Sequence, residues 1–218
     1  MARVAIVLAG GDLVAPEMRL SLPDDAYVVA ADSGVHLGDI LDLHVDCVVG
    51  DMDSADPAAV DAAERAGATI ERHPAEKDAT DLELALVAAQ RHGVDQVVIV
   101  GGAGGRLDHF LANVALLASP RFAELRIEAR FGDARVTVVR GGGAPVELDG
   151  GPGDLVTLLA AGGDARGITT KGLQYALHGE DLPAGTTRGV SNVIVDPPVS
   201  VALDDGTLLV VQPLGGAS

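Results

Sequence analysis

The sequence is short of several residue types, and each shortage excludes a class of protein or a kind of structure. A single cysteine, Cys47, is present among 218 residues, so an internal disulfide framework is excluded and a reducing, cytoplasmic location is expected. No apolar run approaches the roughly 18 residues of a membrane-spanning helix, so we expect no association with a membrane. Tryptophan is absent and there are only two tyrosines, which leaves few aromatic rings for stacking on a planar ligand.

Basic residues are also few. The formal net charge is −17, and the 15 lysines and arginines are scattered along the chain. Nucleic-acid-binding proteins concentrate such residues on one face, so a nucleic acid is excluded as the main partner. Only two of the basic residues are lysines, Lys77 and Lys171, which makes the position of each informative.

The first half of the chain alternates short apolar runs with helical patterns, which is typical of βαβ units and a parallel sheet. Near-continuous runs of valine and isoleucine suit strands that are covered on both faces. The first run leads into Gly10-Gly11-Asp12 without a cleavage pattern, so a buried strand is favoured over a signal peptide. The predicted strands are Val4–Ala9, Tyr27–Ala31, Asp46–Val49, Ala68–Glu71 and Gln96–Val100, and the predicted helices lie near Gly34–Leu41, Pro57–Ala66, Asp81–Arg91 and Arg106–Ala118.

From about Leu125 the pattern changes to short alternating runs separated by turn-rich pieces, with no helical periodicity. The predicted fold class is therefore an α/β N-terminal domain with a mostly parallel sheet, plus an all-β, sandwich-like C-terminal domain. We expect the domains to span residues 1–122 and 123–218. The predicted strands of the second domain are Arg126–Phe131, Arg135–Arg140, Val146–Leu148, Leu155–Leu159, Val199–Leu203 and Leu208–Val211.

Carboxylates follow several of the predicted parallel strands, at the edge where ligands collect. Asp51 and Asp53 come directly after one strand, and Asp56-Pro57 already supplies the cap and first residue of the next helix. Because this pair is not needed for capping, it is interpreted as a Mg²⁺ site, whose remaining ligands would be phosphate oxygens and water. Asp32 occupies the corresponding position after another strand.

The segment from Glu76 to Asp81 admits two interpretations. Thr80 and Glu83 form a capping-box pattern, which would place Asp81 in the first turn of a helix for structural reasons. Lys77 and Asp78 precede the cap and are not explained in this way. A lysine beside carboxylates suits a polyphosphate that is bound with Mg²⁺.

A glycine-rich turn, Gly101 to Gly105, follows a predicted strand and opens a helix, a geometry that directs backbone N–H groups toward an anion. The glycine spacing fits neither a Walker A motif nor a dinucleotide-binding fingerprint. In the helix that follows, Arg106, His109 and Asn113 share one face, and Asp108 lies beside them. This combination favours recognition of phosphate and a nucleoside, although His109 and Asn113 also fit an ordinary helix surface.

Together these blocks resemble the thiamine pyrophosphokinase family, whose pattern is approximately A-D-G-G, G-D-x-D-S, D-K-D-x-T-D, G-G-x-G-G-R-x-D-H and a late G-x-S-N. Each block is short, but the five occur in the same order over nearly the whole chain. They stand here as Ala31-Asp32-Ser33-Gly34, Gly50-Asp51-Met52-Asp53-Ser54, Glu76-Lys77-Asp78-Ala79-Thr80-Asp81, Gly101 through His109, and Gly189-Val190-Ser191-Asn192.

The resemblance implies transfer of pyrophosphate from Mg·ATP to the hydroxyl of thiamine, in a cytoplasmic homodimer whose active site lies between one subunit's first domain and the other's second. It implies that Asp51, Asp53, Asp78 and Asp81 organise Mg²⁺ and phosphate, with Lys77 and Arg106 also catalytic. Residues implied on the ATP side are Asp32, Gly102, Gly104, Gly105, Arg106, Asp108, His109 and Asn113, and those on the thiamine side are Ser191, Asn192 and Tyr175.

The sequence departs from the family pattern in three places. Ser33 stands where a second glycine is usual, and Glu76 where aspartate is usual. Val193 and Ile194 follow the Ser-Asn pair, where an aromatic residue is often found, and Tyr175 is the candidate replacement. Two other functions are kept as alternatives: a pyrophosphokinase for another hydroxymethyl heterocycle, such as a pterin, and a nucleotide-binding protein without catalysis.

Overall fold

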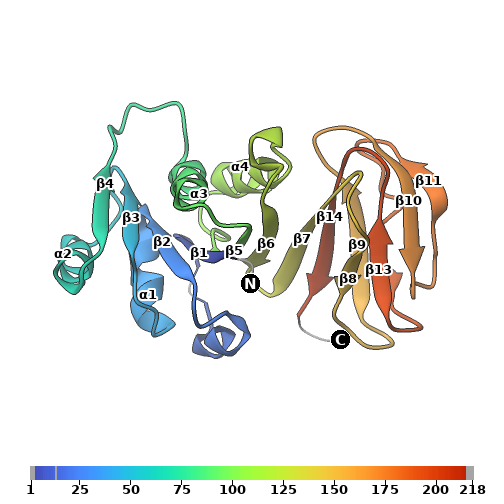
Figure 1. Cartoon of the computed structure of the whole chain (residues 1–218), viewed down its shortest axis with the longest axis horizontal. Coiled ribbons are helices and arrows are strands. Elements are labelled where there is room, and N and C mark those ends of the chain that lie inside the picture. Colours follow the sequence, from blue (N-terminus) through green and yellow to red (C-terminus); the bar gives the residue numbers. More distant parts are fainter. Residues whose placement is uncertain (1–2, 13, 215–218) are drawn as a thin grey trace. The chain divides into compact units, whose positions relative to one another are not determined.

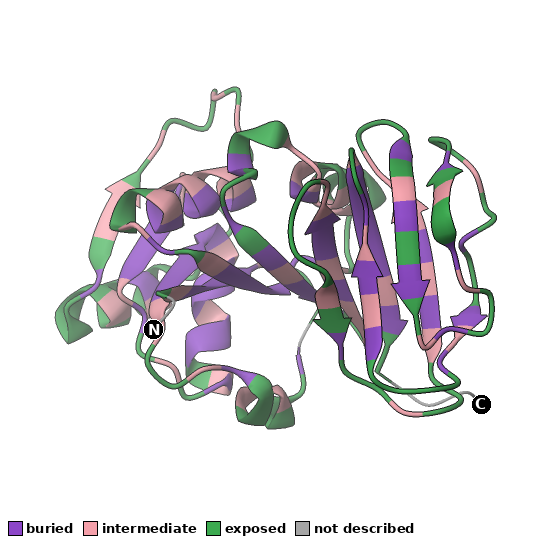
Figure 2. Ribbon diagram, turned by 45° about the vertical axis from the view of Figure 1, so that its right-hand side comes forward, coloured by how far each residue is buried: buried purple, intermediate pink, exposed green. Residues whose placement is uncertain are grey.

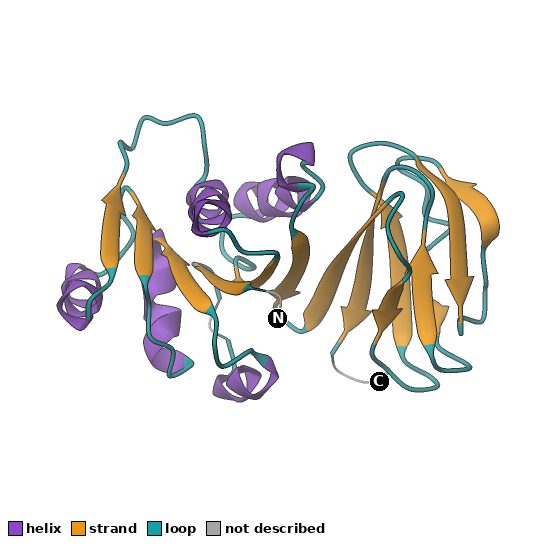
Figure 3. Ribbon diagram, viewed as in Figure 1, coloured by secondary structure: helices purple, strands orange, loops and turns teal. Residues whose placement is uncertain are grey.

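A computed structural model of the chain describes residues 3–12 and 14–214 and divides into two compact units (Figure 1). The first unit comprises residues 1–116 and 124–132, and the second comprises residues 117–123 and 133–218. The predicted fold class, α/β followed by an all-β sandwich, is confirmed (Figure 3). No helix within the described ranges is both long and apolar enough to span a membrane.

The first unit is a parallel sheet with helices on both faces. Its strands lie in the order β6-β5-β1-β2-β3-β4, and every neighbouring pair is parallel. The elements are β1 (Val4–Ala9), η1 (Pro16–Ser21), β2 (Tyr27–Ala31), η2 (Asp32–Val35), α1 (His36–Ile40), β3 (Cys47–Gly50), α2 (Pro57–Ala66), β4 (Thr69–Arg72), α3 (Asp81–His92), β5 (Gln96–Gly101), α4 (Leu107–Leu117) and β6 (Arg126–Phe131).

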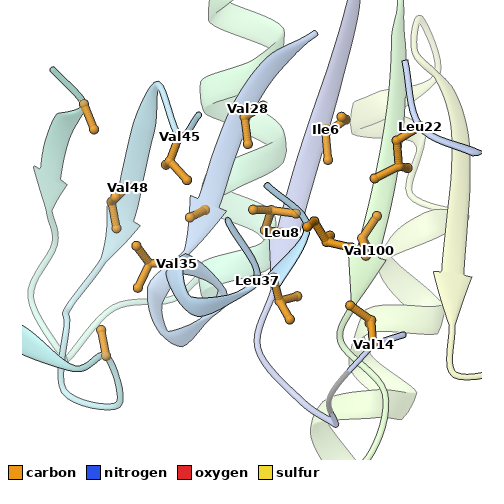
Figure 4. Close-up of a cluster of buried hydrophobic side chains, with 14 of the residues drawn as sticks. Ile6, Leu8, Val14, Leu22, Val28, Val35, Leu37, Val45, Val48 and Val100 are labelled. Carbon is orange, nitrogen blue, oxygen red and sulfur yellow. The ribbon is translucent and has the colours of Figure 1, made fainter. Parts of the chain in front are cut away.

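The near-continuous burial of the central strands explains why their sequences show no alternation. In β1 all residues after Val4 are buried, and Figure 2 shows buried positions running along the parallel strands. Ile6 and Leu8 face one hydrophobic cluster together with Val35 and Leu37, and Figure 4 shows these side chains converging with Val100. The opposite face of the sheet packs against α3, whose alanines and leucines allow close approach.

The strand Arg126–Phe131 was expected in the antiparallel domain, and this assignment is wrong. It is β6, which pairs in parallel with β5, so that Arg126 lies opposite Gln96. Its first residues alternate between exposed and buried, as in a strand with one open face, and this alternation led to the expectation. The predicted helix Gly34–Leu41 is also divided, because the 3₁₀ turn η2 precedes the short α1.

The second unit contains two antiparallel sheets that enclose one core. The strand orders are β12-β9-β14-β7 and β11-β10-β13-β8. Both sheets contribute to a single buried cluster, with Val156 and Leu208 from one and Ile168 and Val201 from the other. The elements are η3 (Pro120–Phe122), β7 (Ala134–Arg140), β8 (Val146–Leu148), β9 (Leu155–Ala160), β10 (Ala165–Lys171), β11 (His178–Leu182), β12 (Asn192–Val193), β13 (Val199–Ala202) and β14 (Thr207–Pro213).

Three strands of this unit were not predicted from the sequence. β10 and β11 are rich in polar residues and glycine, and β12 has only two residues. None of them shows the run of alternating apolar residues on which prediction of a strand depends. They are recruited by pairing with neighbours, as when Asn192 lies opposite Val156 of β9.

Candidate functional site

The first unit contains a cavity of about 600 Å³ at the carboxyl ends of its parallel strands. Its walls come from residues that follow β1, β2 and β5 and from the segment that leads into α3. These strand ends meet at one edge of the sheet, where ligands bind in open α/β folds. The lining includes Gly10, Gly11, Asp32, Ser33, Ser54, Lys77, Thr80, Asp81, Gly102, Gly104, Gly105, Arg106, His109 and Asn113.

Lys77 lies between two carboxylates at this cavity. Its Nζ is 2.7 Å from Oδ2 of Asp51 and 2.9 Å from Oδ1 of Asp81, and the lysine side chain is only 14% exposed. Burial by itself lowers the pKa of the ammonium group, but the hydrogen bonds to Asp51 and Asp81 outweigh this effect and raise the pKa. The hydrogen bond from Lys77 lowers the pKa of Asp51. Lys77 and Asp51 are therefore both charged at neutral pH.

Asp32, Asp51 and Asp53 form an acidic group next to this ion pair. Each offers one oxygen atom, and the three atoms lie within 4.8 Å of one another. Asp32 is 6% exposed, and its Oδ1 is buried without a hydrogen-bond partner in the described part of the chain. Burial raises the pKa of Asp32. A buried carboxylate oxygen without a donor, beside two further carboxylates, fits a hard divalent cation such as Mg²⁺.

The other two acidic residues predicted for the metal site, Asp81 and Asp78, do not belong to this acidic group. Asp81 is the first residue of α3 and is joined to the group through Lys77. Thr80 caps this helix, because its hydroxyl accepts a hydrogen bond of 3.3 Å from the backbone N–H of Glu83. Asp78 is exposed and, among the described residues, does not belong to the group of close carboxylate oxygens that Asp32, Asp51 and Asp53 form. The geometry therefore supports a group containing Asp32, Asp51 and Asp53 more strongly than one containing Asp78.

The glycine-rich turn between β5 and α4 forms another wall of the cavity. Gly102, Gly104 and Gly105 have φ values of 76°, 83° and 63°, a region that side chains disfavour. At Gly104 a Cβ would also lie 2.0 Å from Cγ of Asp12, so the turn after β1 packs directly against it. Asn113 holds the turn from the helix side, since its Nδ2 donates a hydrogen bond of 3.1 Å to the carbonyl of Gly102. Asn113 therefore has a structural role at this wall.

Arg106 and Asp108 form an exposed pair at the start of α4. Nε and Nη2 of Arg106 donate hydrogen bonds of 3.1 and 2.5 Å to the two carboxylate oxygens of Asp108. These bonds lower the pKa of Asp108 to about 2. His109 is exposed and lines the cavity beside Arg106. The guanidinium is thus oriented by Asp108 in a position that is open to solvent.

In the second unit, Asn192 holds two neighbouring segments together. It is 5% exposed, and its Oδ1 accepts hydrogen bonds from the backbone N–H groups of Tyr175 (3.0 Å) and Val193 (2.9 Å). Its Nδ2 donates a hydrogen bond of 2.9 Å to the carbonyl of Tyr175. Ser191, predicted beside it, has a φ of 59°, and its N–H donates to the hydroxyl of Thr157. The Asn192 amide is thus hydrogen-bonded to backbone groups of Tyr175 and Val193, a structural role that the sequence did not predict.

Tyr175 projects from the segment that Asn192 holds. Tyr175 is 64% exposed. The chain has two tyrosines and three phenylalanines, all in the described part, and Tyr175 is the only one of the five that is exposed. Tyr27 is instead stacked on His92, with ring centroids 3.7 Å apart. An exposed ring beside an exposed Ser191 offers a stacking surface and a hydroxyl to a planar heterocycle.

Family models match both units of the chain. The model for the thiamin pyrophosphokinase catalytic domain matches residues 19–129, and the model for the thiamin pyrophosphokinase vitamin B1 binding domain matches residues 145–208. The chain belongs to the thiamin pyrophosphokinase family. The resemblance predicted from the five sequence blocks is therefore confirmed, and the first of these matches covers the residues of the cavity described above from Asp32 through Asn113.

Members of this family with known names or structures align over almost their whole length. Thiamine pyrophosphokinase of Bacillus subtilis is 26% identical over 97% of this chain and 99% of its own length. A crystal structure of a thiamin pyrophosphokinase family protein from Enterococcus faecalis is 28% identical, with a TM-score of 0.77, and covers 97% of this chain and 99% of that one. The thiamin pyrophosphokinase structure from Geobacillus thermodenitrificans is 26% identical, with a TM-score of 0.79, over 96% and 97% of the two chains.

Two cavity residues have more prominent positions in the structure than the sequence motifs indicated. The sequence motifs assign Asp32 to the nucleotide, yet one of its carboxylate oxygens lies within 4.8 Å of oxygens of Asp51 and Asp53. Ser33 was regarded only as a departure from the family pattern, yet it lines the cavity. The available signal for both was their position after β2, because parallel strands bring their carboxyl ends to one edge.

Proposed function

We propose that this protein is a thiamine pyrophosphokinase that transfers the pyrophosphoryl group of Mg·ATP to the hydroxyl of thiamine, giving thiamine diphosphate and AMP. The observation that carries the proposal is the Asp51–Lys77–Asp81 arrangement beside Asp32, since all four residues fall within the catalytic-domain match. The vitamin B1 binding match over the second unit supports thiamine as acceptor over a pterin.

On the donor side, the carboxylates of Asp32, Asp51 and Asp53 would hold Mg²⁺. When bound, Mg²⁺ would supply charge neutralisation to the polyphosphate oxygens. For Asp81 the proposal rests on its contact with Lys77, and for Asp78 it rests on the family resemblance alone. The buried, unpartnered Oδ1 of Asp32 supports its inclusion in this set.

Lys77 and Arg106 would bind and orient the polyphosphate. The raised pKa of Lys77 keeps its ammonium group charged, and Asp51 and Asp81 hold it at the cavity wall. Arg106 is exposed at the glycine-rich turn, whose Gly102, Gly104 and Gly105 also line the cavity. The hydroxyl of thiamine would attack the β-phosphorus, its proton would pass to a carboxylate, and AMP would leave. Such transfers depend mainly on positioning and on stabilisation of charge.

On the acceptor side, the ring of Tyr175 would stack on a ring of thiamine, and Ser191 would offer its hydroxyl. Asn192 would act through the backbone of Tyr175, since its own amide is already hydrogen-bonded. Thiamine is a cation, and a chain with a net charge of −17 attracts it.

Release of AMP tests the proposed reaction. The purified protein is incubated with ATP and Mg²⁺, and AMP is measured with thiamine, with a hydroxymethylpterin, and without an acceptor. We expect AMP only in the reaction that contains thiamine, together with an equal amount of thiamine diphosphate. If AMP forms with the pterin and not with thiamine, the pterin is the acceptor. ATP binding without AMP formation would support a nucleotide-binding protein that is not an enzyme.

We further propose a cytoplasmic homodimer in which each active site uses the first domain of one subunit and the second domain of its partner. Besides the family resemblance, the exposed apolar side chains of Leu107 and Leu111 on α4 support association. Mixing Asp51→Asn subunits with Tyr175→Ala subunits tests this arrangement when thiamine is kept far below its KM, where a ten-fold higher KM leaves Tyr175→Ala with only about a tenth of wild-type activity. A shared site predicts recovery of up to about a quarter of wild-type activity, because half of the randomly formed dimers contain one intact site. No recovery after confirmed subunit exchange would place each site within one subunit.

A further inference from the structure

Three hydroxyl side chains line the cavity of the first unit, and they differ in their hydrogen bonds. The hydroxyl of Thr80 accepts from the N–H of Glu83 as the cap of α3. The hydroxyl of Ser54 donates a hydrogen bond of 3.0 Å to Asp53. That of Ser33 makes no hydrogen bond within residues 3–12 and 14–214. Ser33 therefore contributes a hydroxyl donor that the described protein does not itself use.

The local packing places this hydroxyl beside the turn that follows β1. A Cβ built on Gly10 would lie 2.1 Å from Oγ of Ser33, so the hydroxyl occupies space that only a glycine at position 10 leaves open. The same serine follows Asp32, whose carboxylate belongs to the acidic group. Oγ therefore lies next to Gly10 at the end of β1, and both residues line the cavity that would take the phosphates of a nucleotide.

The charges around the cavity show why a neutral donor matters there. The ammonium group of Lys77 is shared by Asp51 and Asp81, and the guanidinium of Arg106 is paired with Asp108. A polyphosphate entering this cavity meets cations that are already partly neutralised, together with the carboxylate of Asp32. An uncharged donor can also hold its oxygens, and a hydrogen bond to a charged oxygen is stronger than one to a neutral acceptor.

We propose that the hydroxyl of Ser33 donates a hydrogen bond to a polyphosphate oxygen of the bound nucleoside triphosphate. Ser33 is then a binding residue on the donor side that the family pattern, with glycine at this position, does not provide. This inference rests on the proposed function for the nature of the ligand. It concerns binding of the nucleotide and does not require that thiamine is the acceptor.

Direct binding of α,β-methylene-ATP with Mg²⁺ tests the role of Ser33 without requiring turnover. We expect Ser33→Ala to raise the dissociation constant of the analogue about ten-fold, as for one lost hydrogen bond to a charged group. If the wild-type protein also releases AMP, the KM for ATP should rise similarly, while the KM for thiamine and kcat stay within about two-fold. Unchanged nucleotide binding by Ser33→Ala would overturn the proposal.

Ser33→Gly is the matched control, because it removes both the hydroxyl and the Cβ next to Gly10. Loss of affinity similar to that of Ser33→Ala assigns the effect to the hydroxyl. Wild-type affinity in Ser33→Gly together with weak binding in Ser33→Ala would assign the effect to packing and would also overturn the proposal. The thermal unfolding temperature of each variant identifies any loss that results from misfolding. Binding of the analogue by wild-type protein that makes no AMP would reject the proposed enzyme and leave the binding test of Ser33 valid.

Discussion

The donor cavity of the first unit and the Tyr175 segment of the second are built by different physical means. The cavity gathers charged side chains from the ends of several strands, and Lys77 is held by two ion pairs of 2.7 and 2.9 Å. The Tyr175 segment has no ion pair among the described residues Tyr175, Ser191 and Asn192. It is fixed by two neutral hydrogen bonds with Asn192, whose Oδ1 accepts from the N–H of Tyr175 and whose Nδ2 donates to its carbonyl. One site is organised by charge and the other by backbone geometry.

This difference predicts how each site responds to substitution. Charged groups that face a polyphosphate contribute most as charge develops during the reaction, so their removal lowers kcat. An exposed ring mainly contributes to binding, so its removal raises the KM of one substrate. The predictions below test whether effects on kcat and on KM for thiamine separate between the two units.

The largest effect is expected for Asp51, which contacts Lys77 and belongs to the acidic group. Asp51→Asn keeps the side-chain shape but removes the charge, and we expect kcat for AMP release to fall about 10³-fold with Mg²⁺ present. Asp61→Asn, an exposed residue of α2, is the control and should retain wild-type activity. Full activity of Asp51→Asn would remove Asp51 from the proposed cation site.

Lys77 is expected to have the next largest effect. Lys77→Met retains much of the aliphatic chain but leaves Asp51 and Asp81 without their shared cation, so we expect kcat to fall about 10²-fold. Lys171→Met is a matched control, because Lys171 is the only other lysine and is exposed on β10. Equal losses in both variants, or none in Lys77→Met, would contradict a specific role for Lys77.

The Tyr175 ring should affect the acceptor alone. We expect Tyr175→Ala to raise the KM for thiamine about ten-fold, while the KM for ATP and kcat stay nearly constant, since stacking on an aromatic ring contributes about 1–3 kcal/mol. Tyr175→Phe keeps the ring and should resemble the wild type. Steady-state AMP release at varied thiamine and varied ATP measures both constants. A higher KM for ATP in Tyr175→Ala would break the separation between the two sites.

The sequence predicted the donor cavity better than the acceptor segment, and the reason is physical. Asp32, Asp51 and Lys77 are located by the rule that parallel strands end at one edge, which depends only on recognising the strands. The role of Asn192 depends on a hydrogen bond to Tyr175, a residue 17 positions away in the sequence, and no local pattern encodes it. β6 was misassigned for a related reason, because its alternation is compatible with either kind of sheet.

The smallest effect is expected at the opposite edge of the parallel sheet, where the strands begin. A substitution there should change the pH dependence of stability and leave both sites unchanged. Cys47 starts β3 and is 1% exposed, and burial raises its pKa from 9.0 to about 11. Because the folded protein retains this proton more strongly, its contribution to stability is fully present below pH 9 and decreases as the pH rises toward 11. Between about pH 8 and pH 10.5, the wild type should therefore lose about 1 kcal/mol more unfolding free energy than Cys47→Ala.

Urea unfolding of both proteins at these pH values measures the difference. Tyr27 starts β2 close to Cys47, and burial together with Cys47 raises its pKa to about 12. Cys47→Ala removes the part of this shift that Cys47 causes, so the difference between the two proteins includes that part and keeps the same sign. Both proteins should show the same KM for ATP and for thiamine at neutral pH. Parallel pH profiles of stability would mean that the Cys47 thiol does not titrate differently in the folded and unfolded states. Altered kinetics would instead show that the beginnings of the strands influence the cavity at their ends.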